Sequence, residues 1–222
     1  MNKWTLIIPS GGTGSRMGAS RPKQYIEING IPIIVHTLIQ LDVLFDRPQY
    51  IISLVAPWDL YLIPHLEAAG MKSRVDFVSS GEERFNSVKN AIDCVHTEWV
   101  AVHDAVRPFV GESTIQEIRS KIETHPALVP VCSLTDSIRK IDGATNRALD
   151  RNQFVRVQTP QCFHSSVLKS AYKQDYGQAI TDDACLVEAM GVSISLVAGN
   201  EQNIKITTPN DLIIAHQLLV KK

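Results

Sequence analysis

The 222-residue chain contains no apolar run that approaches the roughly 18 residues of a membrane-spanning helix, so we expect no membrane span. Only 6% of its residues are aromatic, and 22 Lys and Arg against 23 Asp and Glu leave a formal net charge of -1. A chain this close to neutrality has no overall attraction for nucleic acid or for an anionic membrane surface, and neither partner is expected. Residues 1–8 lack a basic stretch followed by an apolar core, so export is not indicated.

Cysteine is also scarce, and the four cysteines are far apart, at positions 94, 132, 162 and 185. No CxxC or Cys/His spacing indicates a zinc site, and a disulfide framework is not expected in a chain of this length. We therefore expect inert, reduced thiols and a cytoplasmic location. Because 44% of the residues are apolar, the chain can bury one sizeable core, and we expect a single domain over residues 1–222.

Apolar runs and helical patterns alternate along the chain. Strands are expected at residues 3–9, 50–56, 75–79, 99–103, 127–132 and 193–198. Helices are expected at residues 62–69, 82–95, 112–123, 165–173, 181–190 and 209–220. In the first of these, Pro64 is expected to be tolerable only in the opening turn. The alternation predicts an α/β fold, with a Rossmann-like, mostly parallel central sheet flanked by helices on both faces.

Residues 133–157 interrupt this alternation. Two short segments, residues 137–141 and 147–150, flank the turn signal Asp142-Gly143 and carry many charges. They predict a protruding β-hairpin. A hairpin in such a chain is either an excursion at the edge of the sheet or an arm that reaches a partner.

The first expected strand runs into a glycine-rich segment, residues 9–18. Glycines allow the backbone to approach a ligand and to turn its N–H groups toward phosphate oxygens. Met17 stands where GxGxxG needs its third glycine, and no GxxxxGK[ST] motif is present. Two cations follow, Arg16 and Lys23, and a backbone cradle with two cations suits a triphosphate. A solvated loop with surface cations is the alternative.

The glycine-rich segment and the Pro22-Lys23-Gln24-Tyr25 string resemble the nucleotide-binding signature of the 2-C-methyl-D-erythritol 4-phosphate cytidylyltransferase family, within the nucleotidyltransferase superfamily. The usual pattern has two alanines where this chain has Ser10 and Gly11. Further segments match in the family's order along nearly the whole chain: residues 81–88, 103–108, 150–152, 159–161, 181–183 and 203–207.

The resemblance implies an enzyme that transfers a cytidylyl group from CTP to 2-C-methyl-D-erythritol 4-phosphate, in the non-mevalonate route to isoprenoids. The products are 4-diphosphocytidyl-2-C-methyl-D-erythritol and pyrophosphate. Because two anions must meet, catalysis depends on charge neutralisation and alignment. By resemblance, Arg16, Lys23 and Lys205 are the catalytic residues. The implied CTP-binding residues are Ser10, Gly11, Gly12, Gly14, Gly81, Glu82, Ser87, Asp104 and Ala105.

Asp104 directly follows an expected buried strand, where a carboxylate points into the ligand crevice of a parallel sheet. It can hold a hard divalent cation, and the resemblance implies Mg²⁺; a helix-capping aspartate is the alternative. The neighbouring His103 is assigned a structural role, because a phosphate nucleophile is already ionised and needs no general base.

The implied binding residues for the acceptor phosphate are Arg107, Ser137, Arg151 and Thr181. Ser137 and Arg151 belong to the predicted arm, and in the family this arm reaches the neighbouring subunit. A homodimer with shared sites is therefore expected. Two other functions stay open: a D-ribitol-5-phosphate cytidylyltransferase, which shares the signature, and a non-catalytic nucleotide-binding protein on the same fold.

Overall fold

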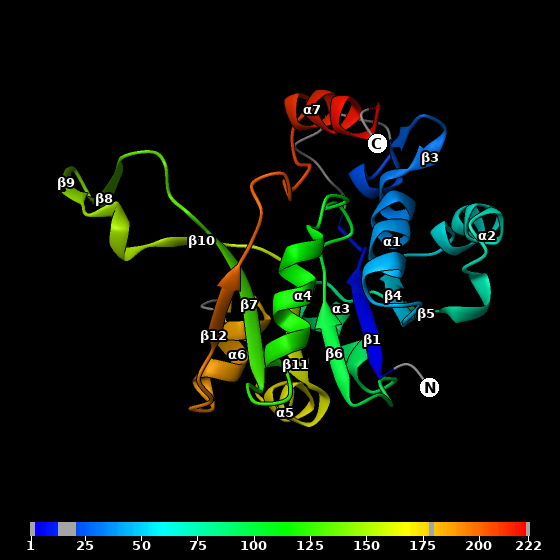
Figure 1. The fold of residues 1–222 in the computed structure, drawn as a ribbon, viewed down its shortest axis with the longest axis horizontal. Helices are drawn as coiled ribbons and strands as arrows, with labels where there is room; N and C mark the ends of the chain where they lie inside the picture. Colours follow the sequence, from blue (N-terminus) through cyan, green and yellow to red (C-terminus); the bar gives the residue numbers. More distant parts are fainter. Residues whose placement is uncertain (1–2, 13–20, 178–179, 221–222) are drawn as a thin grey trace.

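The computed structural model describes residues 3–12, 21–177 and 180–220, and a central sheet runs through it (Figure 1). The strand order is β10-β7-β11-β6-β1-β4-β5, and β12 also pairs with β7. The strands are β1 (Trp4–Pro9), β4 (Gln49–Leu54), β5 (Val75–Ser79), β6 (Trp99–Val102), β7 (Ala127–Ser133), β10 (Val155–Val157), β11 (Gln161–His164) and β12 (Ser195–Ala198). The predicted α/β fold is thus confirmed.

The sheet is mixed, with parallel strands at its centre. β1 pairs in parallel with β4 and β6, and β4 pairs in parallel with β5. β11 runs antiparallel to both β6 and β7, and β10 runs antiparallel to β7. Six of the eight strands therefore run in one direction, and the expectation of a mostly parallel sheet is confirmed; β10 and β11 run the other way. β11 is a four-residue strand that the sequence pattern did not reveal.

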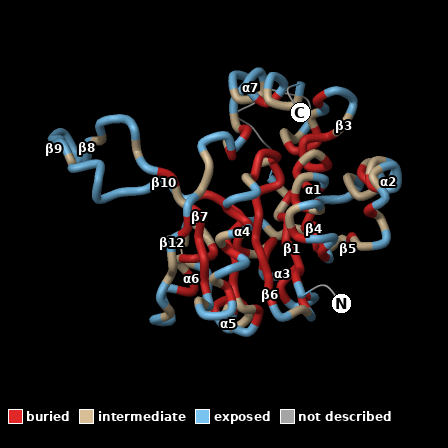
Figure 2. Tube along the Cα trace, in the orientation of Figure 1, coloured by how far each residue is buried: buried red, intermediate tan, exposed pale blue. Residues whose placement is uncertain are grey.

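Helices cover both faces of the sheet. They are α1 (Ile33–Leu44), α2 (Trp58–Ala68), α3 (Arg84–Ile92), α4 (Glu112–Lys121), α5 (Ser165–Ala171), α6 (Asp183–Ala189) and α7 (Pro209–Val220). Along β1, Leu6 and Ile8 join the core that contains α1, α2 and α4, whereas Ile7 joins the core that contains α3, α5 and α6. This alternation follows from the two-residue period of a strand, and it makes the central strands buried on both sides (Figure 2).

Two helices differ from the prediction. α1 was not predicted, because its sequence is apolar on most sides and shows little helical periodicity. α2 begins at Trp58 rather than at residue 62, and Pro64 lies in its interior rather than in its first turn. The expectation for Pro64 is therefore wrong. The helix continues past the proline because Leu62 and Leu66, on either side of it, are fully buried in the core.

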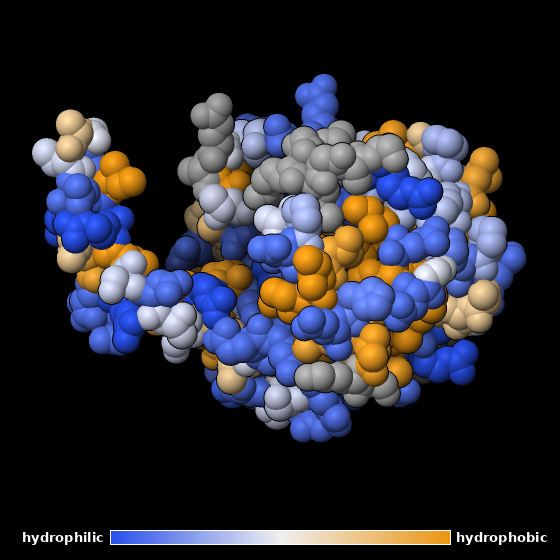
Figure 3. Space-filling model, turned by 90° about the horizontal axis from the view of Figure 1, so that it is seen from above, coloured by the Kyte–Doolittle hydropathy of each residue, from blue (hydrophilic) through white to orange (hydrophobic). Residues whose placement is uncertain are grey.

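The predicted hairpin is present. β8 (Ile138–Asp142) and β9 (Thr145–Leu149) pair antiparallel around Gly143, whose φ of 58° suits glycine in a tight turn. The pair forms a two-stranded sheet of its own and stands away from the rest of the molecule (Figures 1 and 3). Its residues are almost all exposed. We call residues 133–157 the arm. Among the described residues, no helix is long and apolar enough to cross a membrane.

Candidate active site

A cleft of about 290 Å³ opens beyond the carboxyl ends of β1 and β6. β1 lies between β4 and β6 in the sheet, and the chain leaves β1 toward β4 on one side and returns to β6 on the other. The segments that follow β1 and β6 therefore diverge at the carboxyl ends of these two strands. The lining residues are Pro9, Ser10, Gly11, Gly12, Lys23, Gln24, Gly81, Glu82, Glu83, Arg84, Ser87, Asp104, Ala105, Val106 and Lys205.

Most residues of the predicted nucleotide site therefore share one cleft. Of the nine predicted CTP-binding residues, eight line it, and so do the predicted catalytic residues Lys23 and Lys205. The ninth, Gly14, and the third predicted catalytic residue, Arg16, lie outside the described residues. Segments that are up to 196 positions apart in the sequence, from Pro9 to Lys205, thus meet at the carboxyl ends of the strands.

The glycine-rich loop is held by the short helix η2 (Lys23–Tyr25), whose buried Gln24 side chain reaches the loop backbone. Gln24 Nε2 donates to the carbonyl oxygen of Ser10 at 2.7 Å and to that of Gly12 at 2.9 Å. The Ser10 hydroxyl contacts the Tyr25 hydroxyl at 3.1 Å, and the Tyr25 ring stacks on Trp58 of α2. The string after the glycines therefore shapes the loop as well as supplying Lys23.

Two glycines of the cleft pack closely against neighbouring residues, Gly11 against Ser80 of the facing loop and Gly81 against Asn86 of α3. A Cβ atom on Gly11 would lie 2.5 Å from Cβ of Ser80, and one on Gly81 would lie 2.1 Å from Cβ of Asn86. Real side chains do not tolerate such distances. The backbone N–H of Gly81 donates to Ser87 Oγ at 3.1 Å, which ties the Gly81 turn to α3. Both glycines are thus required by packing.

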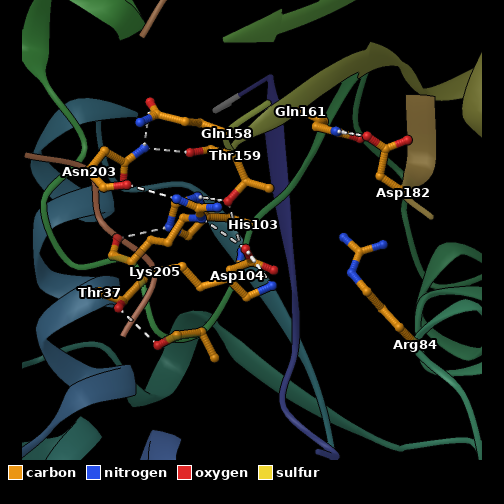
Figure 4. Close-up of polar contacts among 12 residues, drawn as sticks. Thr37, Arg84, His103, Asp104, Gln158, Thr159, Gln161, Asp182, Asn203 and Lys205 are labelled. Carbon is orange, nitrogen blue, oxygen red and sulfur yellow. Dashed lines mark hydrogen bonds and ion pairs between the residues drawn. The ribbon is translucent and has the colours of Figure 1, made fainter. Parts of the chain in front are cut away.

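Asp104 is the charged centre of the cleft (Figure 4). Its Oδ2 atom accepts from Arg107 Nε at 2.9 Å and pairs with Lys205 Nζ at 3.1 Å, and its side chain is only 11% exposed. Burial by itself raises the pKa of Asp104, but the charges of Lys205, Arg84 and Arg107 outweigh it and hold that pKa well below its usual range. The carboxylate is therefore ionised throughout the physiological range.

The donor set suits a hard divalent cation. Both cationic side chains contact Oδ2, and Oδ1 makes no hydrogen bond or ion pair with the described residues. An ionised carboxylate with one uncommitted oxygen, beside a cleft of triphosphate size, matches the way Mg²⁺ is bound by one or two carboxylates and substrate phosphates. No group of three or more His, Cys, Asp or Glu side chains capable of holding a metal occurs within the described part of the chain.

His103 is fully buried and forms a hydrogen-bonded brace beneath Asp104. Its Nε2 atom lies 3.0 Å from the carbonyl oxygen of Arg107, which can only accept, so Nε2 carries the proton. Nδ1 then accepts from the Thr159 hydroxyl at 3.0 Å, and that hydroxyl oxygen accepts from the Asp104 N–H at 3.1 Å. Burial lowers the pKa of His103 to about 4. A neutral, enclosed imidazole agrees with the structural role predicted for it.

The predicted acceptor residues are not gathered in this cleft. Arg107 lies beside it, with Nη1 donating to the Asn203 carbonyl oxygen at 2.8 Å. Thr181 precedes α6. Ser137 and Arg151 belong to the arm, where they line a separate pocket and Arg151 donates to the Thr135 carbonyl oxygen. Figure 1 shows the arm extending away from the central sheet on the side of β7 and β10.

Several residues that shape the site were not singled out from the sequence. Gln24, Thr159 and Asn203 lie within the matched segments. What marks them as important is their burial in the structure, where each polar residue is at most 7% exposed. Asn203 Nδ2 donates to the Thr159 carbonyl oxygen at 2.9 Å, which anchors the segment that carries Lys205. A buried polar side chain needs partners, but its partners become known only from the fold.

The sequence model of the 2-C-methyl-D-erythritol 4-phosphate cytidylyltransferase family matches residues 4–221. The chain belongs to this family. A curated cytidylyltransferase of this name from Phocaeicola vulgatus is 41% identical over 222 residues, covering 99% of this chain and 100% of the relative. The family assignment confirms the predicted enzyme class, a cytidylyltransferase of the non-mevalonate route to isoprenoids.

Solved structures of family members share the fold. The 4-diphosphocytidyl-2C-methyl-D-erythritol synthase from Anaerococcus prevotii superposes with a TM-score of 0.83 at 24% identity and covers 98% of this chain and 96% of its own. The 2-C-methyl-D-erythritol 4-phosphate cytidylyltransferase from Thermus thermophilus superposes with a TM-score of 0.76 at 26% identity, covering 96% and 97%. The likeness therefore extends over nearly the full length of each cytidylyltransferase.

Proposed function

We propose that the cleft binds CTP with Mg²⁺ and that the chain, acting as a single nucleotidyltransferase domain, transfers the cytidylyl group to 2-C-methyl-D-erythritol 4-phosphate. The observation that carries the proposal is the meeting of the glycine loop, Lys23, Lys205 and the ionised Asp104 in one cleft. The family assignment supports this acceptor over D-ribitol 5-phosphate, and it supports catalysis over simple nucleotide binding.

Cytosine is proposed to lie in the part of the cleft that Gly11 and Gly81 line. Its exocyclic amine is a donor where uracil has an acceptor, so a carbonyl oxygen is needed to select it. The Ser10 carbonyl already accepts from Gln24, which favours the Gly81 carbonyl for this role. Glu82 and Ser87 are proposed to complete the base and ribose site.

The triphosphate is proposed to lie along the glycine loop, with Lys23 and Arg16 on the leaving pyrophosphate and Lys205 on the α-phosphate. Their charges stabilise the pentacoordinate transition state that forms when a phosphomonoester oxygen attacks the α-phosphorus. Asp104 would hold Mg²⁺, which supplies further neutralisation of phosphate charge when bound. Arg107 and Lys205 hold the Asp104 carboxylate in place for this.

The acceptor phosphate is proposed to bind Arg107 and Thr181 of one subunit with Ser137 and Arg151 of the other. The isolated, exposed arm supports this arrangement, because a two-stranded hairpin is marginally stable in water and gains stability by packing on a partner. The proposal therefore includes a homodimer with shared sites. A cytoplasmic location stays a prediction from the sequence.

The test is pyrophosphate release by the purified protein with CTP and MgCl₂, assayed against a panel of phosphorylated polyols. We expect release with 2-C-methyl-D-erythritol 4-phosphate and much slower release with D-ribitol 5-phosphate. Preference for the ribitol ester would contradict the acceptor assignment, and CTP binding without release with any acceptor would contradict catalysis.

Two alanine variants, one at a lysine of the cleft and one at a lysine outside it, test whether the reaction takes place in the cleft. Lys23→Ala should lower turnover by about 10²-fold or more, as removal of a transition-state donor does. Lys3→Ala is the matched control, because Lys3 is exposed and pairs with Glu98 at the amino ends of β1 and β6, opposite to the carboxyl ends where the cleft lies.

A further inference from the structure

An ion pair at the wall of the cleft joins two helices that begin beside it. Arg84, the first residue of α3, lines the cleft, and its Nη2 atom donates to Asp183 Oδ2 at 2.6 Å. Asp183 is the first residue of α6 and is fully buried. The Tyr172 hydroxyl donates to the other carboxylate oxygen, so both oxygens of Asp183 are engaged.

The start of α6 has a second anchor next to this pair. Asp182 caps the helix by accepting from the Cys185 N–H at 3.0 Å, and Gln161 Nε2 donates to Asp182 at 2.8 Å. Figure 4 shows Gln161, Asp182 and Arg84 on the opposite side of Asp104 from Asn203. Thr181 is the residue before this cap, so the contacts of residues 182 and 183 determine where Thr181 lies.

The ion pair between Arg84 and Asp183 joins two helices with little expected gain in folding stability. A buried pair usually contributes no more stability than apolar side chains of the same volume, because both charges must be desolvated. Its advantage is geometric: the planar guanidinium fixes direction as well as distance. The Arg84 side chain is 32% exposed toward the cleft, and its other nitrogens make no hydrogen bond with the described residues. The Arg84–Asp183 pair is therefore better suited to orienting α6 relative to α3 than to stabilising the fold.

We propose that Arg84 is a positioning residue, which through Asp183 sets the place of the acceptor-binding segment at Thr181 relative to a nucleotide bound at residues 81–87. The inference deepens the proposed function and rests on it. Arg84 itself extends from the nucleotide side of the cleft, and Asp183 belongs to the acceptor side. Occupancy of one side is thereby coupled to the geometry of the other.

Four variants test this role: Arg84→Gln, Asp183→Asn, the double variant, and Arg84→Lys as the conservative change. In Arg84→Gln and in the double variant, we expect the KM for the acceptor to rise about tenfold or more, as for loss of a charge-assisted hydrogen bond. The KM for CTP should change by less than about threefold, because none of the contacts proposed for CTP comes from Arg84. Arg84→Lys, which keeps one charged donor, should lie in between.

Thermal unfolding separates positioning from stability. Arg84→Gln leaves the Asp183 carboxylate buried without its cation and should lower Tm, whereas the double variant is neutral at both positions and should regain most of that loss. Its acceptor KM should nevertheless stay raised. A double variant with wild-type KM would overturn the proposal, and so would a rise in the CTP KM as large as the rise for the acceptor.

Failure of the proposed function has a different signature. If the wild-type protein released no pyrophosphate, the function would fall, and the coupling would then be read from amide hydrogen exchange. CTP should slow exchange of residues 181–189 in the wild type and not in the double variant. Equal protection in both proteins would overturn the coupling itself.

Discussion

At the residue scale, the cleft depends on polar groups whose state is determined by enclosure. Asp104 stays ionised because three cationic side chains outweigh its burial, whereas His103, a single residue before it, is neutral because burial dominates. Two adjacent buried residues thus differ in charge: the Asp104 side chain is ionised, and the His103 side chain is neutral. The Thr159 hydroxyl joins the two residues, since it donates to the neutral imidazole of His103 and accepts from the backbone N–H of Asp104.

His103 should make stability dependent on pH. Its pKa is about 4 in the folded protein against 6.5 in the unfolded chain, so between these values the unfolded chain binds a proton that the folded one does not. The free energy of unfolding therefore carries the full contribution of neutral His103 above pH 6.5, and it falls by about 3 kcal/mol as the pH drops toward 4. Urea unfolding across this range measures it.

His103→Gln is the control for this effect, because glutamine keeps a donor for the Arg107 carbonyl and does not titrate. The variant should be less stable at pH 7 and should lose most of the pH dependence between 6.5 and 4. An unchanged slope would show that another group is responsible.

Gly11 should resist enlargement because Ser80 lies against it. Gly11→Ala should destabilise the protein by about 1–3 kcal/mol, the usual cost of overpacking, since the new Cβ would lie 2.5 Å from Cβ of Ser80. Combining it with Ser80→Gly should restore much of the loss. Gly12→Ala, which meets nothing within 4 Å, is the matched control, and thermal unfolding of all four proteins decides the matter.

At the scale of elements, the loop after β1 and the helix η2 act as one unit. In the described start of the loop, Gln24 of η2 donates to the carbonyl oxygens of Ser10 and Gly12 and so fixes this backbone. β11 plays a similar part on the other side of the cleft, because Gln161 at its start holds the N-terminus of α6. The short elements η2 and β11 therefore position two segments of the proposed ligand site, the loop after β1 and the start of α6.

Gln24→Met should loosen the glycine loop without emptying the core, because methionine matches the volume of glutamine and lacks its donors. We expect the KM for CTP to rise about tenfold, because two hydrogen bonds are lost: the Gly12 carbonyl loses its donor, and the Ser10 carbonyl keeps only the bond from the Tyr25 hydroxyl at 3.3 Å. Gln40→Met is the control: Gln40 also donates to a backbone carbonyl, that of Val110 at 2.8 Å, away from the cleft. Equal KM values in both variants would argue against a role for Gln24 in the loop.

At the scale of the whole molecule, the arm is the feature that the single chain does not explain. It buries little of its own surface, and Ile141, Val155 and Val157 are each more than 40% exposed. An exposed apolar strand segment is a liability unless another surface covers it. A second copy of the chain, placed with its cleft against the arm, would remove that liability and complete the acceptor site.

Subunit mixing tests this arrangement. Lys23→Ala damages the cleft and Arg151→Ala damages the arm, so a mixed dimer with shared sites has one site with both changes and one site with neither. After complete exchange of equal amounts, half of the dimers are mixed, and activity should recover to about a quarter of wild type. Native mass spectrometry verifies the exchange. Mixed dimers without recovered activity would mean that each chain holds a complete site.

Much of the fold could be predicted because its signals are local. Apolar runs of five or six residues revealed β1, β4 and β5, and the Asp142-Gly143 turn revealed the hairpin. α1 was missed because a helix buried on most sides has no polar face to mark its period. β11 was missed because four residues are too few to show alternation, and its direction depends on a neighbour that precedes it by nearly 60 positions.

The sequence by itself determined most of the strands and helices, the glycines, the cations and the series of segments that identifies the chemistry, because each of these is a property of neighbouring residues. Only the tertiary structure decided which carboxylate is ionised, which histidine is neutral, which glutamine holds the loop and which arginine reaches α6. Those outcomes depend on burial and on partners distant in the chain. Free energies of desolvation and pairing act through space, and no local pattern contains them.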